Sequence, residues 1–481
     1  MFRRTPRHAP LALALVLVLA TVPARAGEPQ DVEPALQTIE RLRHQGEVAE
    51  AARRAGELVA SHPGHLAAHI AYQDAQIALG RRDELLDGYR DRARADGATA
   101  DDRFLHARLL EGAPATHAYK TVLADAPDHF WSLCGLATLL IEDGKARHAA
   151  PLLERAREID ATSPVPLNLL GGIAESEGDT AEAERLYREA ITARPSFVLA
   201  RVNLGTLLVG AGRLDEALTE LDAAVESAPR LALTRLGRGM AHMARGDSEK
   251  AVVDFQVATE TDARDVVSLD LLANAYLNLR RYDEAQEALD KALALDPAHA
   301  PTHVFVAYLN LSLERIEPAL AAAEAALDID PALAEAHHML GLCHERAGSA
   351  KRAEAAYRRA QRADPENPAY VRALGLLYES QSRWRDAVRE YEKLVKLTDG
   401  APDALFDLAL AYWGHDKHDR AATTLETLIA ADEAHLDAWM NLGVLRHRYL
   451  RDRKGARAAF EHYLKRGGTD ERVRDWLREL D

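Results

Sequence analysis

Residues 201–229 decide the fold, and they read RVNLGTLLVGAGRLDEALTELDAAVESAP. Leucines recur in this stretch at intervals of three and four residues, the spacing that places apolar side chains on one face of a helix. Gly212 lies between two such amphipathic segments and indicates a turn. Pro229 cannot continue the second segment, because proline lacks the backbone N–H that a helix interior requires. The stretch therefore predicts two helices joined by a turn.

The same unit recurs along the chain with a period of 34 residues. One position in the second segment is alanine in nine successive units: Ala149, Ala183, Ala217, Ala251, Ala285, Ala319, Ala353, Ala387 and Ala421. A position in the first segment is always small: Gly171, Gly205, Gly239, Ala273, Ala307, Gly341, Gly375, Ala409 and Gly443. A helical bundle needs no fixed period, whereas a solenoid stacks copies of one unit. The periodicity therefore predicts an all-α solenoid.

Two copies of the unit resemble the tetratricopeptide repeat. One carries Leu204, Gly205, Leu208, Ala217, Leu221, Ala224 and Pro229, and the other carries Leu272, Ala273, Tyr276, Tyr282, Ala285, Leu289, Ala292 and Pro297. The resemblance implies a right-handed superhelical solenoid of helix-turn-helix units, with about thirteen repeats. It also implies that the first helix of every repeat lines a concave groove. Large side chains in the second helices, such as Tyr187, Phe255, Tyr357 and Tyr391, are expected to pack into the neighbouring repeat.

The N-terminal segment has the pattern of a secretory signal peptide. Arg3, Arg4 and Arg7 precede a run at residues 11–22 that is apolar except for Thr21. Ala24-Arg25-Ala26 then provides a small-residue cleavage motif before Gly27. The apolar run is too short to cross a bilayer, so we expect cleavage near Ala26-Gly27 and export to the periplasm or the medium. A retained anchor helix is the alternative.

The rest of the chain divides into segments according to how closely each follows the repeat pattern. Residues 27–34 form a short lead-in, and residues 35–129 contain degenerate N-terminal repeats. The regular array occupies residues 130–468. Residues 469–481 form an amphipathic C-terminal helix that we expect to cap the last exposed face.

Composition restricts the partners of the chain. Its 481 residues carry a formal net charge of −16, and such a surface repels nucleic acid and anionic membranes. No stretch after the signal is long and apolar enough to span a bilayer. Cys134 and Cys343 are six repeats apart, too distant for a disulfide. We therefore expect protein or peptide partners, no nucleic acid and no stable membrane insertion, while the oligomeric state stays open.

No catalytic motif occurs in the chain: it has no glycine-rich phosphate loop, no G-x-S-x-G and no H-E-x-x-H. The best metal candidate is the segment HHMLGLCHE, with His337, His338, Cys343 and His344. Cys343 points away from the face that His337 and His344 share, and no second ligand pair follows. We predict no enzyme activity, no cofactor and no metal site, although metal binding by these histidines stays open. We expect His337 to pack between helices and His338 to face the groove.

The groove positions of the family, carried onto this register, give the candidate binding residues. They are Asn168, Val202, Asn203, Thr206, Leu236, Met240, Met243, Asp270, Asn274, Val304, Phe305 and Tyr308. Asparagine amides can donate to and accept from an extended peptide backbone. The apolar residues could hold the side chains of that peptide, and methionine adapts to several shapes.

The leading hypothesis is therefore a non-enzymatic scaffold or adaptor of the cell envelope, which binds segments of partner proteins in its groove. One alternative is an accessory of outer-membrane export machinery, such as pilus or exopolysaccharide secretion, which rests on analogy of fold. Another alternative is a substrate-docking arm of an enzyme complex.

Overall fold

The computed structural model describes residues 32–480 of the chain. Within this range it contains 27 helices and no strand, and helices account for 79% of the residues. Consecutive helices pack in pairs as a solenoid, which confirms the all-α prediction. The predicted signal peptide at 1–26 lies outside the described residues, and the first helix begins at Val32, inside the predicted lead-in.

The chain separates into two compact units, residues 1–281 and residues 282–481. The boundary falls at the turn between two successive helices, Val266–Asn278 and Tyr282–Leu295. Each unit is therefore described by itself.

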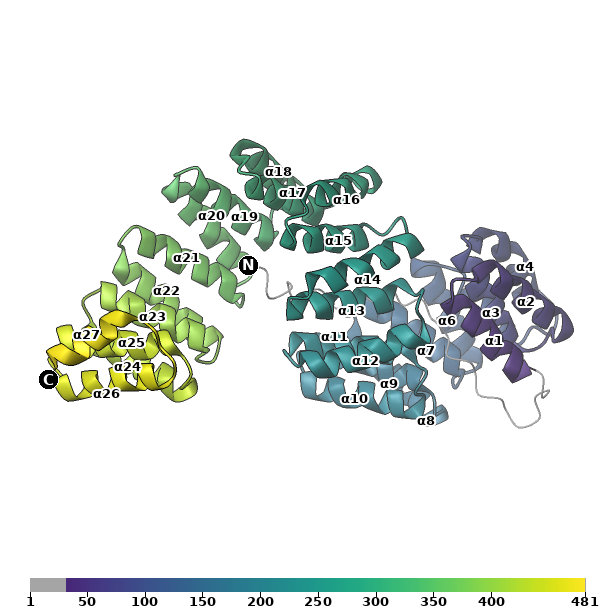
Figure 1. Cartoon of the computed structure of the whole chain (residues 1–481). Coiled ribbons are helices and arrows are strands. Elements are labelled where there is room, and N and C mark those ends of the chain that lie inside the picture. The colour runs from purple at the N-terminus through teal and green to yellow at the C-terminus, as the bar shows by residue number, and fades with distance from the viewer. Residues whose placement is uncertain (1–31, 481) are drawn as a thin grey trace. The chain divides into compact units, whose positions relative to one another are not determined.

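Unit 1 contains the helices coloured purple to teal in Figure 1. In chain order they are α1 (Val32–His44), α2 (Val48–Ser61), α3 (Leu66–Ala78), α4 (Arg82–Arg94), α5 (Ala100–Ala107), α6 (Gly112–Asp125), α7 (Phe130–Glu142), α8 (Ala146–Ile159), α9 (Pro164–Ser176), α10 (Thr180–Ala193), α11 (Val198–Gly210), α12 (Leu214–Ser227), α13 (Ala232–Arg245), α14 (Ser248–Thr261) and α15 (Val266–Asn278).

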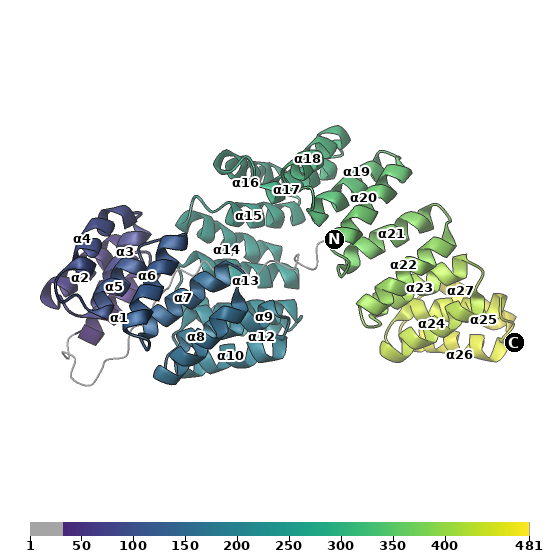
Figure 2. The same ribbon diagram turned by 180° about the vertical axis from the view of Figure 1, so that it is seen from behind.

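Unit 2 contains the helices coloured green to yellow, which Figure 2 shows from behind. They are α16 (Tyr282–Leu295), α17 (Ala300–Ser312), α18 (Ile316–Ile329), α19 (Ala334–Arg346), α20 (Ala350–Ala363), α21 (Pro368–Ser380), α22 (Trp384–Leu397), α23 (Pro402–Gly414), α24 (His418–Ala431), α25 (Leu436–Arg448), α26 (Arg453–Lys465) and α27 (Glu471–Glu479).

Close contact between the two helices of a repeat explains the small residues in the first helix. A Cβ atom placed on Gly205 of α11 would lie 2.5 Å from Leu221 Cγ of α12. The same arrangement joins Gly171 to Tyr187 and Gly239 to Phe255, also at 2.5 Å. The large side chain thus lies over the small residue of its own repeat. Leu221 also reaches the next repeat, since a Cβ atom on Gly237 of α13 would lie 2.8 Å from Leu221 Cδ2.

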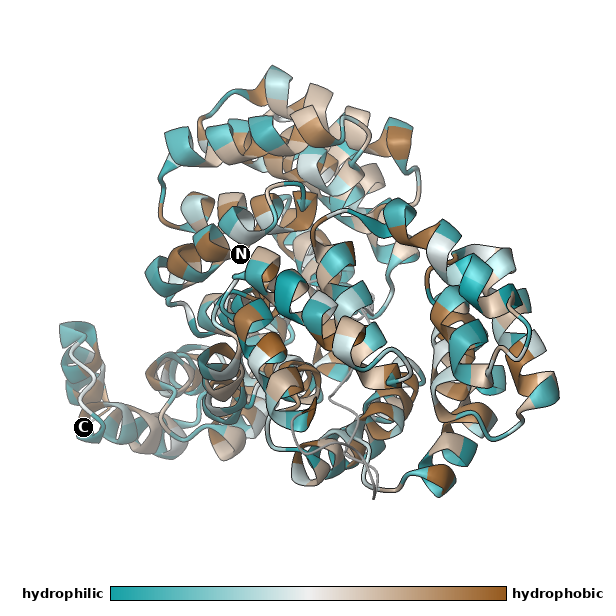
Figure 3. Cartoon of the chain, turned by 90° about the vertical axis from the view of Figure 1, so that its right-hand side faces the viewer, coloured by the Kyte–Doolittle hydropathy of each residue, from teal (hydrophilic) through white to brown (hydrophobic). Residues whose placement is uncertain are grey.

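The repeated alanines are fully buried between the helices. All nine, from Ala149 to Ala421, have 0% of their surface exposed. A larger side chain at this position would push neighbouring helices apart, because protein interiors are close-packed. Figure 3 shows that polar and apolar residues are interspersed along the same helices.

The turn within each repeat uses one residue in the left-handed conformation. This residue recurs at the 34-residue period with φ between 56° and 89°: Gly144, Gly178, Gly212, Gly246, Arg280, Glu314, Gly348, Ser382 and Asp416. A positive φ at the end of a helix lets the chain reverse direction and satisfies free carbonyl groups of the last turn. The turn geometry is therefore kept even where glycine is replaced.

The last helix, α27, covers the end of α26. Val473 and Leu480 are buried beside Phe460 and Tyr463, and Trp476 packs against the same cluster. Within residues 32–480, no helix combines the length and the apolar character that crossing a lipid bilayer requires.

Candidate partner-binding surface

The twelve predicted groove residues lie on first helices of both units. Nine belong to α9, α11, α13 and α15 of unit 1, and three belong to α17 of unit 2. Six of them are buried, with at most 7% of their surface exposed: Asn168, Val202, Leu236, Met240, Asp270 and Val304. The other six are partly exposed: Asn203, Thr206, Met243, Asn274, Phe305 and Tyr308.

The position within the helix explains the burial. Five of the six buried residues are the fifth residue of a first helix, and Met240 is the ninth. Val202 illustrates the fifth position, since its Cγ1 would lie 3.4 Å from a Cβ atom on Gly237 in the first helix of the next repeat. Fifth-position side chains therefore hold successive first helices together, and they offer little surface to a partner.

Two of the predicted amides bind each other. Asn203 Nδ2 on α11 donates to Asn168 Oδ1 on α9 at 2.9 Å. Thr206 Oγ1 donates to the Val202 carbonyl at 2.9 Å, within its own helix. Asn274 differs, because its buried Oδ1 has no hydrogen-bond partner among the described residues. Of these amides, Asn274 is the one whose acceptor oxygen is unused, and this oxygen is shielded from solvent.

Unit 2 has an ion pair at the positions where unit 1 has the amide pair. Arg372 of α21 and Asp407 of α23 approach to 2.8 Å, and they are the fifth and sixth residues of successive first helices. Burial raises the pKa of Asp407 to about 6, although the charge of Arg372 acts in the opposite direction. Successive first helices are thus linked at the same two positions in both units, by an amide pair in unit 1 and by an ion pair in unit 2.

The ninth residue of each first helix distinguishes the units. In unit 1, from α9 to α15, this residue is Gly172, Thr206, Met240 or Asn274. In unit 2 it is apolar or aromatic in five successive first helices: Tyr308, Leu342, Leu376, Leu410 and Val444. Leu376 has 47% of its surface exposed, and the other four are partly exposed. We call these five residues the ninth-position row.

Four residues of this row were missed at the sequence level, because the predicted groove ended at Tyr308. The signal was present, since each member follows the previous one by 34 residues. Extending the register beyond Tyr308 would have identified the row.

The histidine segment on α19 corrects one sequence-based expectation. His338 is buried between the rings of Tyr357 and Tyr370, with centroid separations of 5.5 and 5.2 Å. His337 is partly exposed, and its Nε2 lies 3.1 Å from the Pro331 carbonyl oxygen. The expected roles are thus reversed, because His338 is the fifth residue of its helix and faces the next repeat. Burial lowers the pKa of His338 to about 4.

The remaining members of that segment have separate surroundings. Cys343 is fully buried, and burial raises its pKa to about 11. Burial lowers the pKa of His344. Among residues 32–480, no group of three or more His, Cys, Asp or Glu side chains is arranged to hold a metal ion.

Comparison with known families adds to this geometry. Three family models, all described as tetratricopeptide repeat, match segments that together cover more than half of the chain. The matched segments are residues 134–197, 174–236, 267–299, 307–368, 372–418 and 406–471. Among curated proteins, none matches this chain.

Several solved structures are similar in fold at low sequence identity. The Cut9-Hcn1 hetero-tetramer of APC/C is 13% identical, with a TM-score of 0.41, and the match covers 94% of this chain and 96% of that one. A tetratricopeptide repeat protein of Parabacteroides merdae is 18% identical, with a TM-score of 0.40, covering 55% and 98%. A thermophilic TPR protein of Thermus thermophilus, TTC0263, is 23% identical, with a TM-score of 0.36, covering 38% and 100%.

Repeats of this kind generally mediate protein–protein interactions, and their fold is typical of non-enzymatic scaffolds. The 34-residue period, the paired helices and the matched segments agree with one another. The chain belongs to the tetratricopeptide repeat family.

Proposed function

We propose that this chain is an exported scaffold of the cell envelope that binds segments of partner proteins on its first helices. Thirteen helix pairs followed by the capping helix α27 would use all 27 described helices. The apolar run at 11–22 and the Ala24-Arg25-Ala26 motif support export.

The ninth-position row of unit 2 is the observation that carries the proposal. Apolar side chains at one position of five successive first helices form a series that the stacked repeats present at regular intervals. Leu376 is already about half covered, so covering the rest would contribute about 1 kcal/mol, and several such contacts together can support binding. A partner segment would therefore present apolar side chains in series.

The groups beside the row can be covered without leaving an unpaired charge. Arg372 and Asp407 already form an ion pair, so a partner that excludes water there does not isolate either charge. In unit 1 the partly exposed residues are more polar, with Asn203, Thr206 and Asn274 on the first helices. We therefore assign the apolar part of the partner to unit 2.

Site-specific photo-crosslinking in the native cell tests the proposal. A photoreactive amino acid replaces Leu376 on α21 in one strain and Leu397 on α22 in a control strain. Both leucines are exposed, at 47% and 37%, and both belong to one repeat, but only Leu376 belongs to the row. We expect position 376 to yield a specific adduct that Leu410→Asp abolishes, and position 397 not to yield it.

The same experiment tests the location of the protein. The cross-linked chain should be recovered from the cell envelope, and its N-terminal sequence should begin at Gly27. Adducts that are identical at both positions, or that survive Leu410→Asp, would contradict the binding surface. An intact N-terminus at Met1 on cytoplasmic protein would contradict export.

A further inference from the structure

The first repeat of unit 1 contacts two loops that lie far along the chain. The backbone N–H of Arg230 donates to the His44 carbonyl at 3.2 Å. A Cβ atom on Gly46 would lie 3.5 Å from Arg230 Cβ, so the two backbones run side by side at this point. The loop at 228–231 joins α12 to α13, and the second loop, at 194–197, joins α10 to α11.

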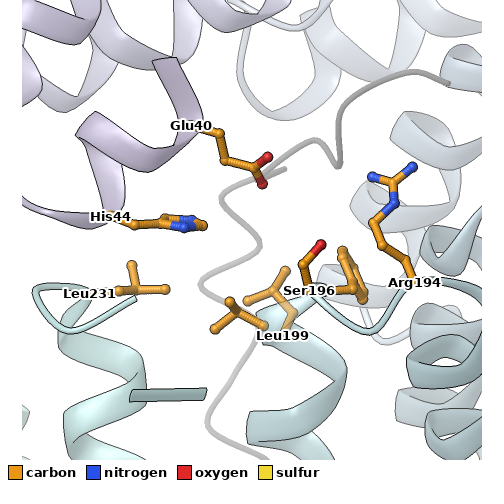
Figure 4. Close-up of a pocket in the computed structure, with 8 residues that line it drawn as sticks. Glu40, His44, Arg194, Ser196, Leu199 and Leu231 are labelled. Carbon is orange, nitrogen blue, oxygen red and sulfur yellow. The ribbon is translucent and has the colours of Figure 1, made fainter. Parts of the chain in front are cut away.

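Side chains of α1 face both loops, as Figure 4 shows. Glu40 and His44 point from α1 toward Arg194, Leu199 and Leu231. These groups line a small pocket of about 10 Å³, close to the space of one water molecule.

Burial shifts the pKa values of the ionisable groups at this contact. Burial raises the pKa of Glu40 and lowers the pKa of His44 to about 4. Burial also lowers the pKa of Arg194, although the charge of Glu40 opposes this. All three shifts show that the charged form of each group is disfavoured when the contact is made. Desolvation of these three groups thus weakens the contact.

The first repeat also has an apolar core of its own. Val32, Leu36 and Ile39 of α1 pack with Ala55 and Leu58 of α2 in a cluster that extends into α3. The larger cluster of unit 1 begins at Ile70 and does not include these residues. Helices α1 and α2 can therefore keep their packing when the contact with the distant loops is lost.

We propose that the first repeat is a releasable clasp, which holds the loops before α11 and α13 and so sets the curvature of unit 1. We call the contact of residues 40–46 with residues 194–199 and 229–231 the N-terminal clasp. When it opens, α1 and α2 move away from the two loops while they stay packed on each other and on α3.

The clasp bears directly on the predicted binding residues of unit 1. Arg194 and Phe197 lie just before α11, which carries Asn203 and Thr206. Leu231 lies just before α13, which carries Met243. Release of both loops would change the separation of α11 and α13. This consequence for binding rests on the proposed function, whereas the clasp itself does not.

Disulfide trapping in the full-length protein tests whether the clasp is closed. The pair Gly46→Cys and Arg230→Cys places two Cβ atoms at about the 3.5 Å separation found here, which is within the range of a disulfide. The control pair is Gly80→Cys and Arg230→Cys, because Gly80 has the same kind of turn with φ of 75° and open space around it. The natural Cys134 and Cys343 are both buried.

We expect the test pair to oxidise at least tenfold faster than the control pair under a mild oxidant. Equal rates would show that the clasp does not form in solution and would overturn the proposal.

Hydrogen exchange of the chain with Leu231→Asp tests release. Val253→Asp is the control, since Val253 lies on α14 of the same unit with 57% of its surface exposed. We expect Leu231→Asp to speed exchange of the Arg230 amide at least tenfold, while amides of α1 and α2 stay protected. Unchanged exchange at Arg230, or equal loss of protection throughout α1 and α2, would overturn the proposal. Neither measurement needs a partner, so each outcome is independent of the proposed function.

Discussion

His338 lies between the rings of Tyr357 and Tyr370 with 7% of its surface exposed. Its neighbour His337 is partly exposed and reaches the Pro331 carbonyl. One step along the helix therefore separates an interior histidine from a surface one. The same rule buries Asn168 and Val202, which are fifth residues of their helices, and leaves Asn203, a sixth residue, partly exposed.

The buried His338 should make unit 2 sensitive to acid. Its pKa is about 4 in the folded chain against an ordinary value near 6.5, so only the unfolded chain takes up a proton between these values. The free energy of unfolding should fall as pH drops from about 6.5 to about 4, by up to roughly 3 kcal/mol. His338→Leu should reduce this loss, as measured by denaturant titration at pH 7 and pH 5.

The control for this prediction is His148→Leu, because His148 is exposed on α8. It should leave the pH dependence as it is in the unmodified chain. An acid response that is the same in the His338 variant and the unmodified chain would refute the assignment.

At the scale of the element, the pair of helices in a repeat depends on close approach at one small residue. Gly205 of α11 leaves room for Leu221 of α12, and there a methyl group would overlap the leucine. Gly210 is the last residue of the same helix, and a methyl group placed on it would meet no atom within 4 Å. Close packing therefore requires glycine at position 205 but not at position 210.

Gly205→Ala should therefore destabilise unit 1 by about 1–3 kcal/mol, because overpacking forces side chains or backbone to shift. Gly210→Ala should be neutral or slightly stabilising, since alanine favours helix by up to about 1 kcal/mol. Thermal unfolding followed by circular dichroism measures both. Equal effects of the two substitutions would show that the helix contact at Gly205 is not tight.

The turn within the repeat gives a second comparison at this scale. Glu314 adopts φ of 59°, which costs a side-chain-bearing residue about 1–2 kcal/mol, and its side chain is exposed. Glu314→Gly should stabilise unit 2 by up to about 1 kcal/mol, after the greater flexibility of unfolded glycine is included.

The reciprocal change one repeat later should have the opposite sign. Gly348 has φ of 70° and open space around it, so Gly348→Ala introduces strain without a clash. We expect a loss of about 1 kcal/mol in the free energy of unfolding, measured by denaturant titration. Two changes of the same sign would contradict a shared turn geometry.

At the scale of the whole molecule, the regular part of the chain was predictable from its period. Helix pairing, buried alanines and turn glycines all follow from residues spaced by 34 positions, because one unit's packing rules apply to every copy. No pattern in the sequence indicated the boundary between the two units at Arg281. Arg280 replaces a turn glycine there, but Glu314, Ser382 and Asp416 do the same elsewhere.

The candidate site was predicted in part. The register placed all twelve candidate residues on first helices, but it did not separate buried fifth-position residues such as Val202 from exposed ones, since that depends on the distance between neighbouring first helices. The contact of His44 with Arg230 was beyond sequence reasoning for a similar reason. Small rotations between repeats add up over the unit, and no local pattern encodes their sum.

The constant length of the unit has a consequence for how such a chain can change. A tandem duplication of 34 residues within 300–435 would add one left-handed turn, one tight helix contact and one side chain to the ninth-position row. A duplication of any other length would put the wrong residues at all three places. Such a chain can therefore lengthen by whole repeats to bind a longer partner, while the contacts within each existing repeat stay unchanged.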